Sequence, residues 1–333
     1  MRKRRLSSLQ SRSQSETKDY GPVPTARAWP WTSEANESIH RLFQCRDGKV
    51  RTFDWRNVIS LKDGVEVDAK YDHGITALMK AAEENYVGIV QLLIQRGADV
   101  NAKDEDGTTA LFWASGKEEA DIAKLLIENG ADVNAKETHD GRTALMWAAS
   151  AGNSVVVRLL IEKGAEVNAE DRYGETALMK TAGGGYFGIA RMLIDGDANL
   201  DAKDARGRTA LMYAVDEGHD DIARMLVEKG ADVNARDKYD HWTVLMCAVN
   251  AGHKNLVQLL IENGADVNAK NKHGETALMR SVVDEDIEIA RLLIKNGADA
   301  SAENKKGQTA LTLAREIGRT PLLGILKAHG AKE

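Results

Sequence analysis

The sequence has little of what stiffens or cross-links a chain. Aromatic residues make up 5% of its 333 residues and there are 4 prolines, a composition that disfavours a β-sandwich. Two cysteines, Cys45 and Cys247, are too few for a disulfide framework, and we expect both to be reduced and packed in the interior. Because no run of about 18 apolar residues occurs, a membrane-spanning helix is excluded.

The charge balance gives no reason to expect a nucleic-acid partner. Lys and Arg number 45 against 51 Asp and Glu, which leaves a net charge of −6 at pH 7. Charged residues at 29% and hydrophobic residues at 43% are the balance of a soluble globular protein. Since no nucleophile–base pair, glycine-rich phosphate loop or His/Cys cluster is evident, we expect neither catalysis nor a cofactor or metal.

A motif that recurs about every 33 residues organises the chain. Thr followed by Ala or Val stands at Thr76, Thr109, Thr143, Thr176, Thr209, Thr243, Thr276 and Thr309. Each Thr is followed by two apolar stretches at helical spacing, and then by a Gly-Ala-Asp-Val-Asn turn or a close variant of it. The Thr predicts the N-cap of a first helix, and the Gly predicts the left-handed residue that ends a second helix. Pairs such as Asp106-Gly107 predict a hairpin turn before the next Thr.

Helix, turn, helix and hairpin in every repeat resemble the ankyrin repeat family, over about residues 40 to 333. The resemblance implies an all-α repeat fold, an ankyrin-repeat solenoid with a helix-turn-helix and a β-hairpin loop in each repeat, that binds partners on its loop tips and its concave face. One departure is systematic, because the chain reads Thr-Ala-Leu-Met where the family usually reads Thr-Pro-Leu-His. The departure removes a proline from the first helical turn and replaces histidine hydrogen bonds with methionine packing.

Three regions are expected along the chain. Residues 1–28 are basic at their start and rich in Ser and Gln, which predicts a disordered tail. Residues 29–70 are predicted to form a degenerate N-terminal capping repeat, and residues 71–333 eight ankyrin repeats, the last of which is a C-terminal cap. We expect a cytoplasmic monomer, and in a eukaryotic cell the basic run from Arg2 to Arg5 would suit a nuclear address.

The residue four positions after each repeated Thr defines the candidate binding site. This set, which we call the row, is Lys80, Trp113, Trp147, Lys180, Tyr213, Cys247, Arg280 and Leu313. Tryptophan, tyrosine and arginine are enriched at binding hot spots, so we expect a protein or extended peptide to bind along the row in a non-enzymatic scaffold. The other interpretation is that the rings only fill the space between the two helical layers.

A small-ligand sensor is the alternative function. Trp113 and Trp147 stand at the same position of consecutive repeats, about 10 Å apart, so a nucleotide or a methylated cation could lie between their indoles. The pairing is similar to the aromatic cage in the ankyrin modules of certain histone lysine methyltransferases. Trp242 is a second place for such a ligand, since it stands in a loop where a polar residue is usual; stacking on the next loop also accounts for it. A third hypothesis, a docked polyanion, uses Lys80, Lys180, Arg280 and the N-terminal arginines.

Two features of the turns complete the pattern. Gly183-Gly184-Gly185 ends one first helix and Asp197 replaces the usual turn glycine, which predicts either a soft joint or a notch for a ligand backbone. The asparagine of the Asp-Val-Asn turn resembles the pattern that asparaginyl hydroxylases modify in ankyrin proteins, and side-chain hydrogen bonds that stabilise the turn also account for it. These asparagines are Asn101, Asn134, Asn168, Asn234 and Asn268.

Overall fold

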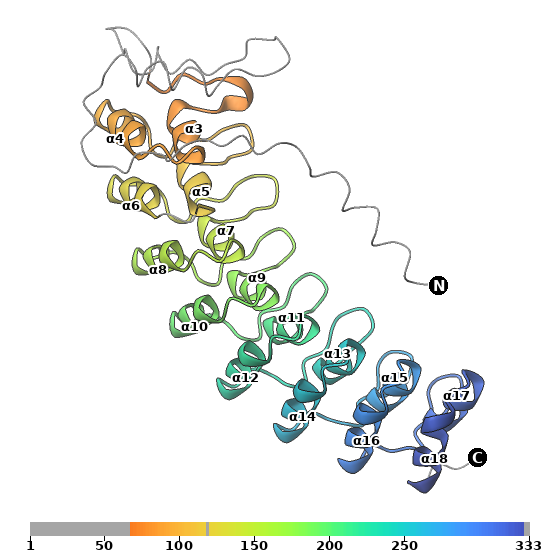
Figure 1. The fold of residues 1–333 in the computed structure, drawn as a ribbon. Coiled ribbons are helices and arrows are strands. Elements are labelled where there is room, and N and C mark those ends of the chain that lie inside the picture. The colour runs from red at the N-terminus through yellow and green to blue at the C-terminus, as the bar shows by residue number, and fades with distance from the viewer. Residues whose placement is uncertain (1–66, 118–119, 330–333) are drawn as a thin grey trace, which may run out of the picture. The chain divides into compact units, whose positions relative to one another are not determined.

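The computed structural model describes residues 67–117 and 120–329, all of which fall within one of two compact units of the chain, Val58–Glu333. The expected tail at 1–28, Cys45 and nearly all of the expected cap at 29–70 lie outside the described residues. Within them the chain forms a short 3₁₀ turn, Asp72–Gly74, and 16 α-helices (Figure 1). No described helix is long and apolar enough to cross a membrane.

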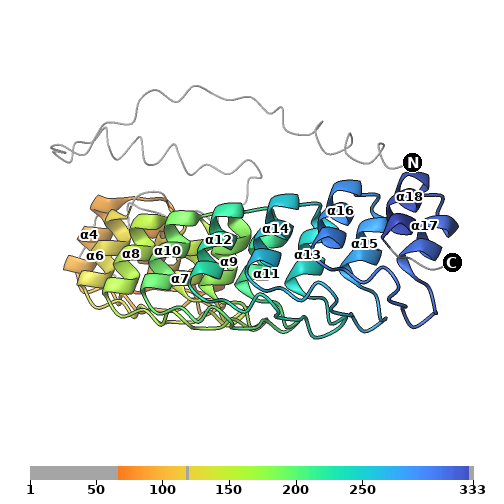
Figure 2. The same cartoon turned by 90° about the horizontal axis from the view of Figure 1, so that it is seen from below.

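The helices come in pairs, one pair in each repeat. The first helices are α3 (Ala77–Glu83), α5 (Ala110–Ser115), α7 (Ala144–Ser150), α9 (Ala177–Gly184), α11 (Ala210–Asp216), α13 (Val244–Ala251), α15 (Ala277–Val283) and α17 (Ala310–Glu316). The second helices are α4 (Val87–Gln95), α6 (Asp121–Glu128), α8 (Ser154–Glu162), α10 (Phe187–Asp195), α12 (Asp220–Glu228), α14 (Lys254–Glu262), α16 (Ile287–Lys295) and α18 (Thr320–Ala328). First helices pack on first helices and second helices on second helices, so the pairs form two layers (Figure 2).

The core lies between these two layers and is built from small and branched apolar side chains. Leu78 and Met79 of α3 are buried, as is Leu93 of α4. The positions of Leu78 and Leu93 are buried in all the following repeats, and that of Met79 in all but two, where Phe112 and Thr312 are half-buried. The alanines at the start of each first helix, such as Ala77, let neighbouring helices approach closely. The resulting core is continuous from repeat to repeat, which is the packing expected of a solenoid.

Each first helix begins at the repeated Thr, which confirms the predicted N-caps. The hydroxyl of Thr76 accepts a hydrogen bond from the backbone N–H of Met79, and the other seven threonines cap their helices in the same way. In α3 the sulfur of Met79 accepts from the N–H of Thr76 at 3.5 Å and so completes a capping box. Methionine thus satisfies one more backbone donor at this helix start.

The turn glycines that follow the second helices are left-handed, as predicted. Six of them, from Gly97 to Gly297, have φ between 83° and 94°. Asp197 adopts the same left-handed region with φ of 61°, a conformation that aspartate tolerates better than most residues. The left-handed residue is therefore kept in all seven turns that the structure describes, including the one that lacks the glycine.

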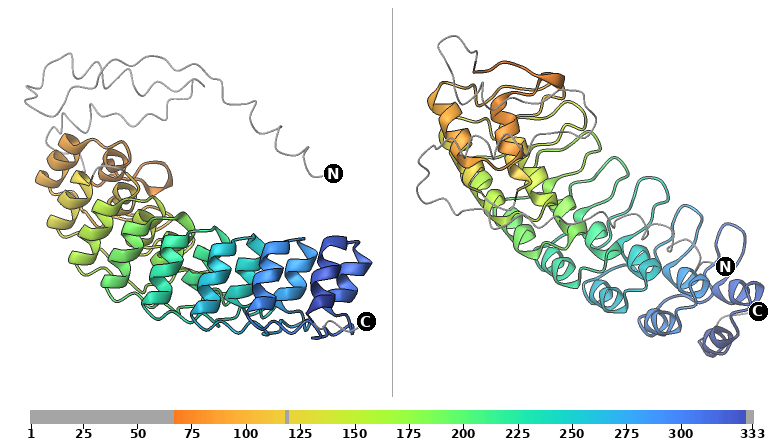
Figure 3. Two further views of the ribbon diagram at one scale, coloured as in Figure 1. Left: turned by 60° about the horizontal axis from the view of Figure 1, so that its bottom comes forward. Right: turned by 45° about the horizontal axis from the view of Figure 1, so that its top comes forward.

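The loops that precede the first helices, which we call fingers, gather along one edge of the helix pairs (Figure 3). The backbone N–H of Asp104 donates to the carbonyl of Thr108 at 3.1 Å and closes its finger, and most of the other fingers close in the same way. Antiparallel bridges occur at Lys136 with Thr143 and at Arg236 with Thr243, in the two longer fingers. Within the described residues there is no strand longer than these isolated bridges. The fingers are therefore closed loops, and the β pairing expected of the hairpins is limited to the two bridges.

The turn asparagines join each repeat to the next. The side-chain amide of Asn234 donates to the carbonyl of Gly264 at 3.1 Å, and its oxygen accepts from the N–H of Asp266 at 2.8 Å. The same pair of bonds is made by Asn101, Asn134, Asn168 and Asn268. The side chains therefore stabilise the contact between two repeats as well as the turn itself, and their hydroxylation stays a prediction.

Candidate protein-binding surface

The row lies on the first helices beside the fingers, and most of its side chains are half-buried. Lys80, Trp113, Trp147, Lys180, Tyr213, Arg280 and Leu313 belong to this half-buried set. Cys247 differs, because its side chain is 8% exposed and burial raises the pKa of its thiol to about 12. The row therefore presents solvent-accessible side chains on both sides of α13, with a buried thiol between them.

In the fingers before α9 and α11, a buried carboxylate at the base of the finger positions the row residue of the same repeat. One oxygen of Asp171 accepts from the N–H groups of Tyr173 and Glu175, both at 2.9 Å, and the other lies 2.9 Å from the ammonium nitrogen of Lys180. Asp204 is bonded to its own finger in the same manner, and its second oxygen accepts from the hydroxyl of Tyr213 at 2.8 Å. The carboxylate thus shapes the finger and orients the row side chain together.

A second sequence pattern marks the residues at the base of the fingers, and the repeated Thr motif alone does not reveal it. An acidic or amide residue stands nine or ten positions before each row residue from Trp113 onward. The set is Asp104, Glu137, Asp171, Asp204, Asp237, Asn271 and Asn304. The spacing is informative only once the finger is known to fold back onto its own first helix.

Glu175 connects two row residues of neighbouring repeats. One of its carboxylate oxygens lies 2.5 Å from the ammonium of Lys180, and the other accepts from the hydroxyl of Tyr213 at 3.0 Å. Burial, the hydrogen bond from Tyr213 to Asp204 and the charge of Glu175 raise the pKa of the Tyr213 phenol far above its usual range. The phenol is therefore protonated at neutral pH, and Lys180 and Tyr213 act as a link between α9 and α11.

Arginines lie over four of the aromatic rings along the row and fingers, and one of them is Arg172, 6.0 Å from the ring centre of Tyr173. Arg208 lies 4.4 Å from the ring centre of Tyr213, and Arg280 lies 5.4 Å from that of Trp242. Arg142 lies 5.9 Å from the ring centre of Trp147, which also stacks on Phe112 with centroids 5.1 Å apart. A methylated cation at Trp147 or Trp242 would have to displace the arginine already there, so nothing in this geometry favours the small-ligand hypothesis.

Trp113 is the exception among these rings. It is half-buried on α5, and within the described residues no ring or cation stacks on it. The neighbouring Phe112, which the sequence did not suggest, packs on Trp147 instead. The two tryptophans thus differ in their contacts, because Trp147 is held between α5 and α7 by a ring and a cation, whereas Trp113 makes no such contact with the described residues.

The other two cations of the row are matched by acids of their own helices. The ammonium of Lys80 lies 2.7 Å from Glu83 and 2.8 Å from Glu84, and the guanidinium of Arg280 lies 2.9 Å from Asp284. Burial alone would lower the pKa of Lys80, but the hydrogen bonds and charges of the two glutamates outweigh burial and raise it. The row cations therefore carry little unmatched charge for a polyanion.

Comparison with protein families agrees with this geometry. The family model for ankyrin repeats in three copies matches residues 56–137, 78–171, 135–204, 167–237 and 236–304. The chain belongs to the ankyrin repeat family. Ankyrin repeats generally mediate contacts between proteins. A search of curated proteins finds no match to the sequence.

The three glycines of the fourth ankyrin repeat lie against aromatic rings: Gly184 against Tyr186 of the same repeat, and Gly183 and Gly185 against rings of the next repeat. Gly185 has a φ of 74°, and a Cβ atom there would lie 2.6 Å from Cε1 of His219. Nε2 of His219 lies 3.2 Å from the carbonyl oxygen of Gly183, and a Cβ on Gly183 would lie 3.6 Å from the ring of Tyr213. The rings of His219 and Tyr213 thus occupy the space next to the glycines, and a soft joint stays an untested prediction.

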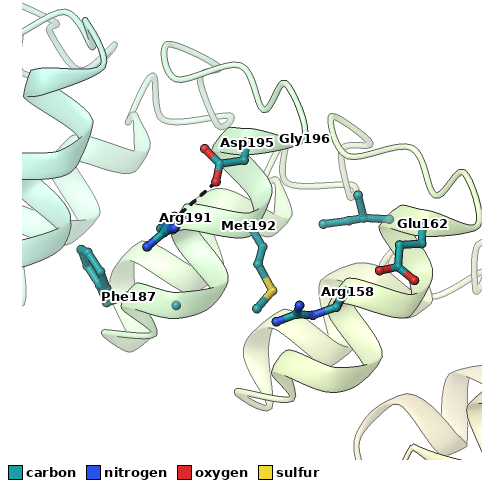
Figure 4. A pocket seen from close by; sticks show the side chains of 9 residues that line it. Arg158, Glu162, Phe187, Arg191, Met192, Asp195 and Gly196 are labelled. Carbon is teal, nitrogen blue, oxygen red and sulfur yellow. Dashed lines mark ion pairs between the residues drawn. The ribbon is translucent and has the colours of Figure 1, made fainter.

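A hollow of about 620 Å³ lies on the second helices, between α8 and α10 (Figure 4). Its lining mixes Phe187 and Met192 with Arg158, Glu162 and Arg191, and Arg191 pairs with Asp195 at 3.7 Å. The described part of this ankyrin array contains no group of three His, Cys, Asp or Glu suited to a metal ion. The hollow is open and mixed in charge, and it offers no set of polar groups that converge on a ligand.

Proposed function

We propose that this ankyrin repeat protein is a non-enzymatic scaffold that binds a protein or an extended peptide along the row. The observation that carries the proposal is the placement of half-buried Trp113, Trp147 and Tyr213 on first helices α5, α7 and α11, with an arginine over each of the last two rings. Rings and guanidinium groups in a rigid frame are the side chains that dominate binding energy, because they offer a large contact area and lose little conformational freedom.

The contacts divide the row into two kinds of position. Lys180 and Tyr213 are bonded to Asp171, Asp204 and Glu175, so they fix the spacing of α9 and α11. Trp113 makes no such bonds, and we propose it as the principal anchor for a partner. Arg280 is a second contact, because its guanidinium bridges Asp284 and the ring of Trp242 at the surface.

The test compares a row variant with a matched variant of the opposite layer. Wild type, Trp113→Ala/Arg280→Ala and Phe187→Ala are used as baits in a cell lysate, and captured proteins are identified by mass spectrometry. Phe187 is an exposed aromatic residue on the second helix α10, so its removal controls for the loss of a surface ring. Circular dichroism establishes that each bait is folded.

We expect a protein captured by wild type to be retained by Phe187→Ala and lost by the row variant. Truncation of a hot-spot residue costs about 2 kcal/mol or more of binding free energy, which is roughly a 30-fold loss of affinity. Equal capture by all three baits would show that the row is packing only.

A further inference from the structure

We propose that the tips of the last five fingers form a second binding surface, which fits an acidic extended segment of a partner protein. The residue that follows the base residue of each of these fingers is cationic, except for Ala205, which stands next to Arg206. This set, the basic tips, is Arg172, Arg206, Lys238, Lys272 and Lys305, and all five side chains are exposed. The surface shares the proposed protein-binding role, but it uses none of the row residues.

The backbone holds these fingers in sequence. The N–H of Lys238 donates to the carbonyl of Arg206 at 2.8 Å, the N–H of Lys272 to the carbonyl of Asp240 at 2.9 Å, and the N–H of Lys305 to that of His273 at 2.9 Å. Each finger is therefore tied to the one before it by a single main-chain hydrogen bond near its tip. The basic tips are thus presented one per repeat along the edge seen in Figure 3.

The charge of the basic tips is largely unmatched. Lys272 pairs with Asp240 at 2.5 Å and Arg172 lies 3.9 Å from Asp140, whereas Arg206, Lys238 and Lys305 make no ion pair within the described residues. The cations that precede the fingers differ, because they donate to carbonyls of the following finger. Examples are Lys136, Arg236 and Lys270. The basic tips therefore place exposed positive charge once in each of five successive fingers of a chain that is acidic overall.

The first fingers have the opposite charge. Glu105 and Asp106 are exposed on the finger before α5, and Asp72 is exposed on the finger before α3. A nucleic acid carries one sign of charge along its whole length and would be repelled at that end. A protein segment can place acidic residues on the basic tips and neutral or basic residues beyond them, so a segregated edge selects a protein.

The spacing of the tips matches an extended chain. Neighbouring packed helices lie about 10 Å apart, and an extended chain in the polyproline II conformation advances about 3.1 Å per residue with three residues per turn, so every third side chain points the same way. An acidic residue at every third position therefore meets one basic tip in each repeat. Tyr173 and Tyr239, which are 48% and 60% exposed beside Arg172 and Lys238, supply rings for the intervening residues to pack on.

The experiment uses a fluorescein-labelled peptide of about 15 residues, which is long enough to span five fingers. Glutamate stands at every third position, with glycine and serine between. A second peptide of the same composition has its glutamates consecutive, a third carries lysine in place of glutamate, and a single strand of thymidine nucleotides of similar length is the nucleic-acid probe. Binding to the full chain is measured by fluorescence anisotropy at physiological salt.

The protein variants reverse two charges on each face. Arg206→Glu/Lys238→Glu changes the basic tips, and Lys163→Glu/Arg224→Glu changes two exposed cations of the second-helix layer as the matched control. We expect the spaced glutamate peptide to bind wild type and the control variant with equal affinity. Its affinity for the tip variant should be lower by about tenfold or more. Trp113→Ala/Arg280→Ala should bind this peptide with the affinity of wild type. The experiment therefore tests the proposal for the tips even if the proposal for the row is wrong.

Three results would overturn the proposal. Equal weakening by the tip, control and row variants would remove the assignment to the tips. Equal binding of the spaced, consecutive and lysine peptides would remove the complementarity of charge and spacing. Tighter binding of the thymidine strand than of the spaced peptide would assign the surface to nucleic acid.

Discussion

The hydroxyl of Tyr213 lies 2.8 Å from a carboxylate oxygen of Asp204, the residue that shapes the finger of the same repeat. The hydroxyl oxygen is also 3.0 Å from Glu175, which belongs to the preceding finger. One phenol proton thus lies between two carboxylates, and ionisation of the phenol would place three negatively charged groups together. The contact between α9 and α11 therefore depends on a neutral phenol.

This geometry predicts the alkaline stability of the protein. In the unfolded chain the Tyr213 phenol ionises near its ordinary pKa of 10.0, whereas in the folded protein the pKa is raised. The stability that the neutral phenol provides is complete below pH 10 and is lost as the pH rises above that value. Tyr213→Phe should therefore flatten the decline of the melting temperature between about pH 10 and pH 11. Parallel declines of wild type and variant, followed by circular dichroism, would contradict the assignment.

Removal of the buried carboxylate of Asp171 should destabilise the fourth repeat. Asp171→Ala removes the acceptor of two backbone N–H groups and one partner of Lys180, and we expect a loss of about 2–3 kcal/mol in the free energy of unfolding. Asp171→Asn keeps the acceptor, as Asn271 and Asn304 do in later fingers, and should lose less. Urea unfolding measures both, and equal losses would mean that the backbone bonds contribute little.

The link between the turns can be strengthened at Asp201. Asp201 accepts from the N–H of Asp232 at 2.9 Å, but a carboxylate cannot donate to the carbonyl of Gly230 as the asparagines do at the equivalent position. Asp201→Asn should add this bond and stabilise the fold by about 0.5–1 kcal/mol. Asn234→Asp removes the corresponding bond to Gly264 and should destabilise it by a similar amount. A lower urea midpoint for Asp201→Asn would contradict the bridging role.

A side chain at Gly185 should be tolerated poorly. Gly185→Ala forces alanine into a left-handed conformation and brings its Cβ to 2.6 Å from His219. Gly164→Ala is the matched control, because Gly164 has a φ of 83° with no atom within 4 Å of the added carbon. We expect the free energy of unfolding, measured by thermal unfolding, to fall by about 1 kcal/mol in the control and by about 2–3 kcal/mol in Gly185→Ala. Equal costs would show that the His219 ring moves aside freely.

The features that the sequence predicted well depend on residues that are close together along the chain. The hydroxyl of Thr76 reaches an amide three residues along the chain, and a turn glycine such as Gly97 acts through its own backbone angles. The spacing of such residues therefore predicted the helix pairs, the caps and the family. The aromatic and cationic residues of the row were also identified, because they stand at one fixed position of the repeat.

What the sequence did not predict depends on contacts between repeats. Glu175 and Tyr213 are 38 residues apart, and Phe112 reaches Trp147 in the next repeat, so neither pair follows from local spacing. The sequence suggested Lys80, Lys180 and Arg280 as cations for a polyanion. Each of them is matched by a nearby carboxylate, a result of side-chain conformations that a pattern does not specify.

The single main-chain bond between successive fingers has a mechanical consequence. A pulling force applied at the two ends of the array would pass through every junction in series, so each junction bears the full load. Where Asn168 or Asn234 joins two turns, the side-chain amide adds a second attachment to the next repeat, and at Asp201 that attachment is missing. The array would therefore extend by the release of one repeat after another, with the junction at Asp201 yielding before those at Asn168 and Asn234.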